Sequence, residues 1–257
     1  MAVAATPALV ERESFLAGLR EARREADEGG GRLVLIGGEA GGGKTALVRA
    51  FASECEGSTR VLAGACDALY TPRPFAPVAD VAAQIGGELA ELLERDARPY
   101  EVSAALLDEL RAPGTMLVFE DYHWADEASL DLLRLLGRRV AATRGLVLVT
   151  YRDDELQADH PLRVVVGGLA GGAGVERMRL TPLTLEAVEQ LAEPHRVDAE
   201  QLFHRTGGNP FFVTEALASA GAELPPTVRD AVLARAAGLD REAREVLEAV
   251  SVVPPRV

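Results

Sequence analysis

Several features are scarce or missing in this sequence of 257 residues, and each absence excludes a class of protein. Only two cysteines occur, Cys55 and Cys66, without the paired spacing of a zinc site, so we expect reduced thiols packed in the interior. No apolar run reaches the length of a membrane span, and the opening residues lack the basic and apolar regions of a signal peptide. We therefore expect a cytoplasmic protein that does not bind membranes.

Positive charge is also scarce, because 27 basic residues face 40 acidic ones and the net charge is −13. This balance disfavours broad nucleic-acid binding through this chain, since duplex binding depends largely on the neutralisation of phosphates. Lysine is rarer still: Lys44 is the single lysine, and every other basic residue counted is an arginine. The place of that lysine is the strongest indication of function.

Lys44 lies in a glycine-rich stretch, GGEAGGGKTALVRAF, at residues 37–51. Its pattern, a glycine, four other residues and then Gly-Lys-Thr, is typical of a phosphate-binding loop. Glycines let successive N–H groups converge on phosphate oxygens, the lysine reaches the terminal phosphates as a compact charge, and the threonine hydroxyl binds Mg²⁺. Arginine's planar fork is larger and does not fit the same site. The residues expected to bind ATP or ADP here are Gly38, Gly41, Gly42, Gly43, Lys44, Thr45 and Ala46.

Short apolar segments alternate with amphipathic ones up to about residue 180, and after Pro182 the pattern is helical only. Such alternation predicts a parallel sheet covered by helices on both faces. The expected strands are residues 32–36, 60–65, 115–119, 145–150 and 176–180. The expected helices are residues 13–26, 44–53, 78–95, 100–111, 126–142 and 241–252. We expect a proline-broken loop around Pro72, Pro74 and Pro77, and a glycine-rich turn at residues 167–174.

Charged residues follow two of these strands. Glu120 and Asp121 end the segment MLVFED, and Arg152 follows GLVLVTY. In a phosphate-loop protein one carboxylate holds Mg²⁺ and the other polarises an attacking water, and the sequence does not decide which does which. Thr45, Glu120 and Asp121 are therefore the candidate metal ligands, and Arg152 is a candidate sensor of the γ-phosphate. The alternatives are solvated turn carboxylates and an ordinary surface arginine.

Three residues just beyond the acidic pair are also candidates. His123 is a possible γ-phosphate contact, and the single tryptophan, Trp124, fits core packing better than catalysis. Asp126 is of the residue type that caps a helix, and the expected helix at 126–142 begins there.

Seven segments in a fixed order identify a family: LVERESF, GGEAGGGKT, LVFEDYHWADEASLDLL, VTYRDDE, HPL, LTPLT and TGGNPFFVTEAL. The chain resembles the ATP-binding regulatory module of the signal-transduction ATPases (STAND) within the AAA+ superfamily. It looks most like the module at the N-terminus of large LuxR-type transcriptional regulators. The resemblance implies that Val10 and Arg12 flank the adenine, although Glu11 stands where the family usually has glycine. It also implies that Pro210 of a lid domain packs on the nucleoside.

The resemblance implies a fold of class α/β, a P-loop NTPase with a three-layer parallel sheet, followed by a small helical lid and the start of a winged-helix segment. The corresponding domains are residues 1–180, 181–222 and 223–257. Regulators of this type continue with a helical-repeat sensor and a helix-turn-helix. We therefore expect this chain to be part of a longer protein, and any DNA binding to need that further domain.

Three functions remain for the structure to address. The first is a regulatory switch that binds ATP, hydrolyses it slowly as a weak Mg²⁺-dependent ATPase, and self-associates in the ATP state. The second is an AAA+ ATPase that drives a mechanical or remodelling step, with Arg134, Arg138 or Arg139 as the arginine given to a neighbour. The third, a DNA-binding protein in its own right, conflicts with the charge of −13.

Overall fold

The computed structural model describes residues 9–69, 71, 73–219, 226–237 and 241–251. The chain divides into two compact units, Met1–Thr181 and Pro182–Val257. This division lies next to residue 180, where the sequence places the end of its first domain. The other expected boundary, between residues 222 and 223, lies outside the described residues.

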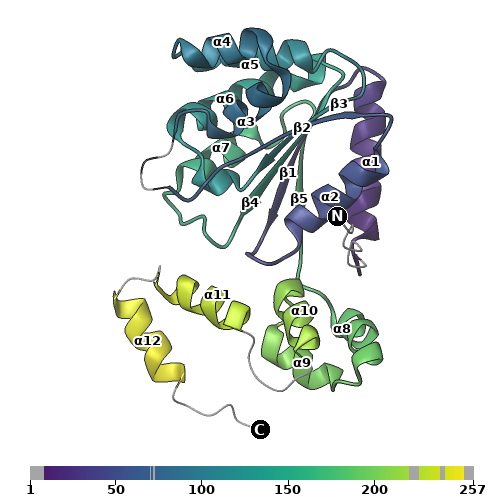
Figure 1. Ribbon diagram of the computed structural model, residues 1–257, viewed down its shortest axis with the longest axis vertical. Coiled ribbons are helices and arrows are strands. Elements are labelled where there is room, and N and C mark those ends of the chain that lie inside the picture. The colour runs from purple at the N-terminus through teal and green to yellow at the C-terminus, as the bar shows by residue number, and fades with distance from the viewer. Residues whose placement is uncertain (1–8, 70, 72, 220–225, 238–240, 252–257) are drawn as a thin grey trace. The chain divides into compact units, whose positions relative to one another are not determined.

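A parallel sheet of five strands forms the centre of the first unit (Figure 1). The strands are β1 (Arg32–Gly38), β2 (Arg60–Ala65), β3 (Thr115–Glu120), β4 (Leu146–Arg152) and β5 (Val175–Arg179). They pair in the order β2-β3-β4-β1-β5, and every pair is parallel. The predicted α/β P-loop fold is confirmed. The sheet order adds that β4 lies between β1 and β3.

Helices cover both faces of this sheet (Figure 1). On one face lie α1 (Glu13–Asp27) and α2 (Lys44–Glu54), whose buried side chains share a core with alternate residues of β1, β3 and β4. The larger core on the other face takes in α3 (Ala76–Ile85), α4 (Gly87–Glu94), α5 (Pro99–Glu109), α6 (Glu127–Arg139) and α7 (Pro161–Leu169). Two short 3₁₀ turns, η1 (Tyr122–Trp124) and η2 (Val140–Ala142), flank α6.

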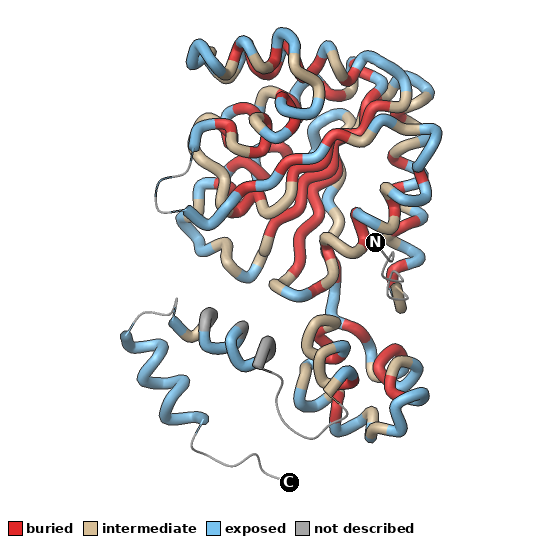
Figure 2. Tube along the Cα trace, in the orientation of Figure 1, coloured by how far each residue is buried: buried red, intermediate tan, exposed pale blue. Residues whose placement is uncertain are grey.

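The central strands are buried on both faces, as their continuous apolar sequences require (Figure 2). In β1, Leu33 and Leu35 belong to the larger core, while Val34 and Ile36 belong to the core under α1 and α2. All four side chains are fully buried. Because both faces hold β1 in place, the loop that follows it starts from a fixed point.

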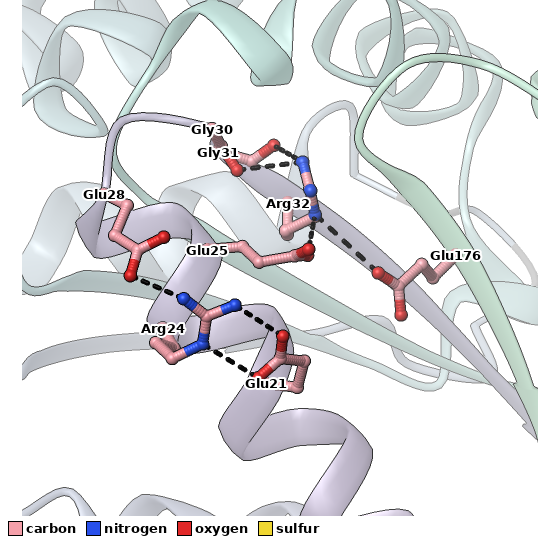
Figure 3. A network of polar contacts seen from close by, with 8 residues as sticks. All are labelled: Glu21, Arg24, Glu25, Glu28, Gly30, Gly31, Arg32 and Glu176. Carbon is pink, nitrogen blue, oxygen red and sulfur yellow. Dashed lines mark hydrogen bonds and ion pairs between the residues drawn. The ribbon is translucent and has the colours of Figure 1, made fainter.

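An arginine fixes the amino-terminal end of β1 (Figure 3). Arg32 Nε lies 2.6 Å from the Glu25 carboxylate of α1 and 3.7 Å from that of Glu176 in β5. Its Nη1 also donates to the Gly30 carbonyl at 3.0 Å. These contacts join the helix before β1 to the edge strand beside it, at the end of the sheet opposite the phosphate loop.

The proline-rich segment is more helical than its sequence suggests. The expectation of a loop through Pro77 is wrong, because α3 begins at Ala76 and takes Pro77 into its first turn. Proline fits there, since the first N–H groups of a helix have no partner within it. The expected helix at 78–95 is also two helices, because Gly86, at φ +65°, ends α3. Pro72 lies outside the described residues.

The expected turn at residues 167–174 is wrong in its first part, because Gly167 and Gly168 lie in α7. This helix buries Leu162, Val165 and Leu169, and their packing outweighs the low helix propensity of glycine. The turn itself comes later, at Gly171 and Gly174, where φ is +76° and +74°.

The second unit is helical throughout the part that the structure describes. Its elements are α8 (Leu185–Ala192), the 3₁₀ turn η3 (Glu193–His195), α9 (Ala199–Thr206), α10 (Pro210–Ala218), α11 (Pro226–Ala237) and α12 (Arg241–Ser251). Helical structure after Pro182 was predicted. In neither unit does a described helix have both the length and the apolar character to cross a membrane.

Candidate functional site

The phosphate loop, the acidic pair and Arg152 lie where three neighbouring strands end. β1 leads into the phosphate loop, β3 ends at Glu120, and β4 ends at Arg152. Gly38 pairs with Arg152 across the β1–β4 ladder, so the arginine stands directly beside the start of the loop. Since β4 separates β1 from β3, Arg152 lies between the loop and the acidic pair.

The phosphate loop leads into the N-terminus of α2, whose first N–H groups no described side chain caps. Gly41 and Gly43 have φ of +80° and +89°, in the left-handed region that favours glycine. Gly43 is the residue before α2, and in the part of the chain that the structure describes no side chain caps that helix. The backbone N–H groups of its first turn, which includes Ala46, are therefore available to an anion, and the helix dipole favours negative charge there.

Lys44 is held beneath this loop with 7% of its surface exposed. Its Nζ donates to the carbonyl oxygens of Gly38 at 2.7 Å and Glu39 at 2.9 Å. Because an ammonium group has three N–H donors, one is left for a ligand. Burial lowers the pKa of Lys44, and the nearby Arg152 cation lowers it further. The negative charge of a bound phosphate would raise this pKa again, because an anion stabilises the ammonium form.

The two carboxylates of the acidic pair face different partners. Glu120 accepts a hydrogen bond from the Thr45 hydroxyl, which joins the end of β3 to the start of α2. Asp121 lies instead near two nitrogen groups, with Oδ1 4.0 Å from Arg152 Nε and 3.9 Å from His123 Nδ1. Hydroxyl and carboxylate oxygens are the ligands that Mg²⁺ prefers, so Thr45 and Glu120 are the pair suited to hold it.

Asp121 has a strained backbone, with φ of 54° and ψ of 41°. Its N–H donates to the hydroxyl of Thr150, in β4, at 3.1 Å. Left-handed residues other than glycine are uncommon and tend to occur at functional sites. The hydrogen bond fixes the turn that carries Asp121 beside β4.

His123, Trp124 and Arg152 form a stack beside Asp121. The Arg152 guanidinium lies 4.7 Å from the centre of the Trp124 ring, and the centres of the His123 and Trp124 rings are 4.4 Å apart. The His123 side chain is 1% exposed, and neither of its nitrogens has a hydrogen-bond partner among the described residues. Burial lowers the pKa of His123 to about 3, with further contributions from Arg152 and Lys44, so the imidazole is neutral at pH 7. Trp124 also packs against the larger core, as its sequence context suggested.

Sequence reasoning missed two residues of this group, Thr150 and Glu155. Glu155 Oε1 lies 2.5 Å from Arg152 Nη1. Both residues flank Arg152 in the segment TYRDDE, so their closeness to that arginine along the chain was a usable signal. Their partners after β3, Asp121 and His123, follow from the sheet order, which the sequence pattern does not provide.

Arg12 is buried below the loop, with 3% of its surface exposed. Its guanidinium donates to three backbone carbonyls, those of Glu11 at 3.2 Å, Gly42 at 3.4 Å and Thr181 at 2.9 Å. Burial lowers its pKa. Arg12 thus joins the segment before α1 to the loop and to the end of the first unit. Val10 is half-buried in the same segment.

Glu11 has φ of +56°, a conformation that glycine adopts at lower cost. The backbone at Glu11 thus takes a conformation that a glycine at this position could also take. In the second unit, Pro210 is the first residue of α10, and Asn209 caps that helix by accepting from Phe211 N at 3.1 Å. The arginines considered for a neighbouring subunit are exposed on α6: Arg134, Arg138 and Arg139.

Comparisons with known proteins identify a family and a similar fold. The family model described as "AAA ATPase domain" matches residues 8–149. The fold resembles that of a signal transduction ATPase with numerous domains (STAND) from Pyrococcus horikoshii, which carries a tetratricopeptide repeat sensor. The TM-score is 0.53 at 20% identity, over 96% of this chain and 35% of that one. The chain thus spans about a third of that protein's length.

Two other solved structures overlap less well. Cdc6p from Pyrobaculum aerophilum has a TM-score of 0.45 at 17% identity, over 75% of this chain and 51% of its own. The Holliday junction branch migration motor RuvB from Thermotoga maritima has a TM-score of 0.43 at 18% identity, over 94% and 76%. No curated protein matches the chain. Since the family model covers more than half of the sequence and contains both the loop and the acidic pair, the chain belongs to the AAA ATPase domain family.

Proposed function

We propose that this chain is an ATP-binding regulatory switch that hydrolyses ATP slowly, within a transcriptional regulator of the LuxR type. The main support for a nucleotide site is the hydrogen bond between Thr45 and Glu120. It brings the hydroxyl after the loop of β1 together with the carboxylate at the end of β3, although β4 lies between these two strands. The regulatory role is supported by the order of motifs along the chain, including VTYRDDE and TGGNPFF. The likeness to the STAND protein supports the fold that such a switch uses.

The residues present fit a nucleoside triphosphate with Mg²⁺. The uncapped start of α2 and the free donor of Lys44 suit phosphate oxygens. Thr45 and Glu120 would hold Mg²⁺, which when bound neutralises charge on the β- and γ-phosphates. Asp121 stands apart from that pair and is the carboxylate left to orient an attacking water. Arg152 would contact the γ-phosphate.

Val10 and Arg12 are proposed to lie beside the adenine, with Arg12 acting through the carbonyls that it binds. Pro210 is proposed to pack on the nucleoside from the lid. In this proposal ATP closes the lid and promotes self-association, and hydrolysis to ADP resets the switch. With a net charge of −13, this chain is not expected to bind DNA itself.

Two measurements test this proposal: the rate of ATP turnover, and the mass of the particle that the purified chain forms in solution. Light scattering on the purified chain is expected to show a larger particle with ATP and Mg²⁺ than with ADP, and turnover below about one per second. Asp121→Asn, which leaves the Thr45–Glu120 pair intact and should slow hydrolysis, should keep the larger particle for longer after ATP is added. An Arg49→Ala control, on the exposed side of α2, should behave as wild type.

The same site is equally compatible with an AAA+ ATPase that drives a remodelling step. Turnover well above about one per second, with a particle mass that does not depend on the nucleotide, would favour that function and contradict the switch. Loss of that fast turnover in Arg134→Ala, Arg138→Ala or Arg139→Ala would identify the arginine supplied to a neighbour.

A further inference from the structure

Glu155 has a carboxylate that faces two groups of the site at once. Oε1 lies 2.5 Å from Arg152 Nη1, and Oε2 lies 3.4 Å from His123 Nε2. The Glu155 side chain is 37% exposed, whereas that of His123 is 1% exposed. One carboxylate thus joins the residue at the end of β4 to the buried imidazole that follows β3.

Among the described residues, Glu155 is the one carboxylate that hydrogen-bonds to Arg152. Asp121 is 4.0 Å from its Nε, which is too long for a hydrogen bond. The remaining contact is the face of Trp124, at 4.7 Å from the ring centre. Glu155 therefore determines where the guanidinium rests.

The Glu155 carboxylate competes with a γ-phosphate for Arg152, because the expected role of Arg152 is to contact that phosphate. The cation lowers the pKa of Lys44, so it lies within the electrostatic reach of the phosphate loop. A guanidinium that binds a carboxylate edge-on through Nη1 has to leave it, wholly or in part, to bind a phosphate with the same edge. ATP and ADP differ only in the γ-phosphate, so this competition would affect ATP and leave ADP unchanged.

We propose that Glu155 is a positioning residue that holds the Arg152 guanidinium through Nη1 until a γ-phosphate takes the place of its carboxylate, and so sets the ratio of ATP to ADP affinity. The proposal rests on the function proposed above, since it needs a nucleotide at the loop. On release of Arg152, the Glu155 carboxylate keeps His123 as its neighbour, at Oε2. The order of events is therefore phosphate binding, exchange of the arginine, and a change in the surroundings of Trp124.

The variant that tests this is Glu155→Gln, which removes the charge and keeps the shape. ATP is expected to bind about fivefold more tightly, the factor that corresponds to about 1 kcal/mol for a partly exposed ion pair, and ADP equally well. Calorimetry with each nucleotide measures the ratio. The matched control is Glu109→Gln, because Glu109 is 34% exposed, is 2.7 Å from Arg60 and belongs to α5, away from the loop.

Trp124 supplies a second measurement, since it is the single tryptophan of the chain and contacts Arg152. In wild type, ATP should change its fluorescence and ADP should not. Glu155→Gln should change the emission before any nucleotide is added, and Glu109→Gln should leave it unaltered. If the role of Glu155 were purely structural, Glu155→Gln would change the affinities for ATP and for ADP by the same factor.

A double-mutant cycle identifies the arginine as the route of the effect. The variant Arg152→Gln should lose most of the preference for ATP, and adding Glu155→Gln to it should change nothing more. An unchanged ATP to ADP ratio in Glu155→Gln, or a gain that persists without Arg152, would overturn this inference alone. Absence of any nucleotide binding by the wild type would overturn the proposed function as well.

Discussion

Replacement of Lys44 by alanine is the most direct test of the phosphate loop. Lys44 Nζ already donates to Gly38 O at 2.7 Å and Glu39 O at 2.9 Å, which leaves one of its three donors for a phosphate oxygen. The loss in affinity is then that of one charge-assisted hydrogen bond, about 1.5–3 kcal/mol. This corresponds to a dissociation constant for ATP that is roughly 10- to 150-fold higher.

The assay is calorimetric titration of ATP with Mg²⁺, with circular dichroism to show that each variant is folded. Arg49→Ala removes the same charge from an exposed position of the same helix and should bind ATP as wild type does. Lys44→Arg should also bind poorly, because the larger guanidinium has to replace an ammonium that is 7% exposed. An affinity of Lys44→Ala within twofold of wild type would refute the assignment of the loop.

Three further predictions concern other parts of the first unit. Glu120→Gln should raise the Mg²⁺ concentration needed for ATP binding, whereas Asp121→Asn should bind ATP normally and lower turnover by about 100-fold; if both variants keep full turnover, neither carboxylate is catalytic. Gly64→Ala should destabilise the protein by about 3 kcal/mol in urea unfolding, because the new Cβ would lie 1.9 Å from the carbonyl oxygen of Pro77 in α3. Burial raises the pKa of the Cys66 thiol from 9.0 to about 12, so the folded protein should resist alkylation at pH 8 and lose stability as pH rises from 9 to about 12. Rapid labelling of Cys66 without denaturant would contradict that burial.

The sequence predicts the site best where one residue type has one possible role. The loop from Gly38 to Thr45 is such a case, since its glycines, lysine and threonine each meet a separate need of a phosphate ligand. The pair Glu120 and Asp121 was found in the same way, but their roles were not separated. That separation depends on which neighbour each carboxylate faces, Thr45 or Arg152, and this is a property of three-dimensional position.

The parts that sequence reasoning missed depend on packing between distant segments. Nothing in the pattern of β4 shows that it lies between β1 and β3, so the contacts of Thr150 and Glu155 with residues after β3 could not be foreseen. The helix α7 was missed because Gly167 and Gly168 lower its local propensity, while Leu162 and Val165 stabilise it through the core. Local preference and tertiary packing disagree there, and packing decides.

The position of the single lysine also determines how the chain reacts with amine reagents. Lys44 carries the only side-chain amine of the sequence, and it is held under the loop with 7% of its surface exposed. Acylating reagents that modify many lysines in an ordinary protein would meet one side chain here. Since a bound phosphate would cover that amine, the extent of acylation at Lys44 measures the occupancy of the site without any introduced probe.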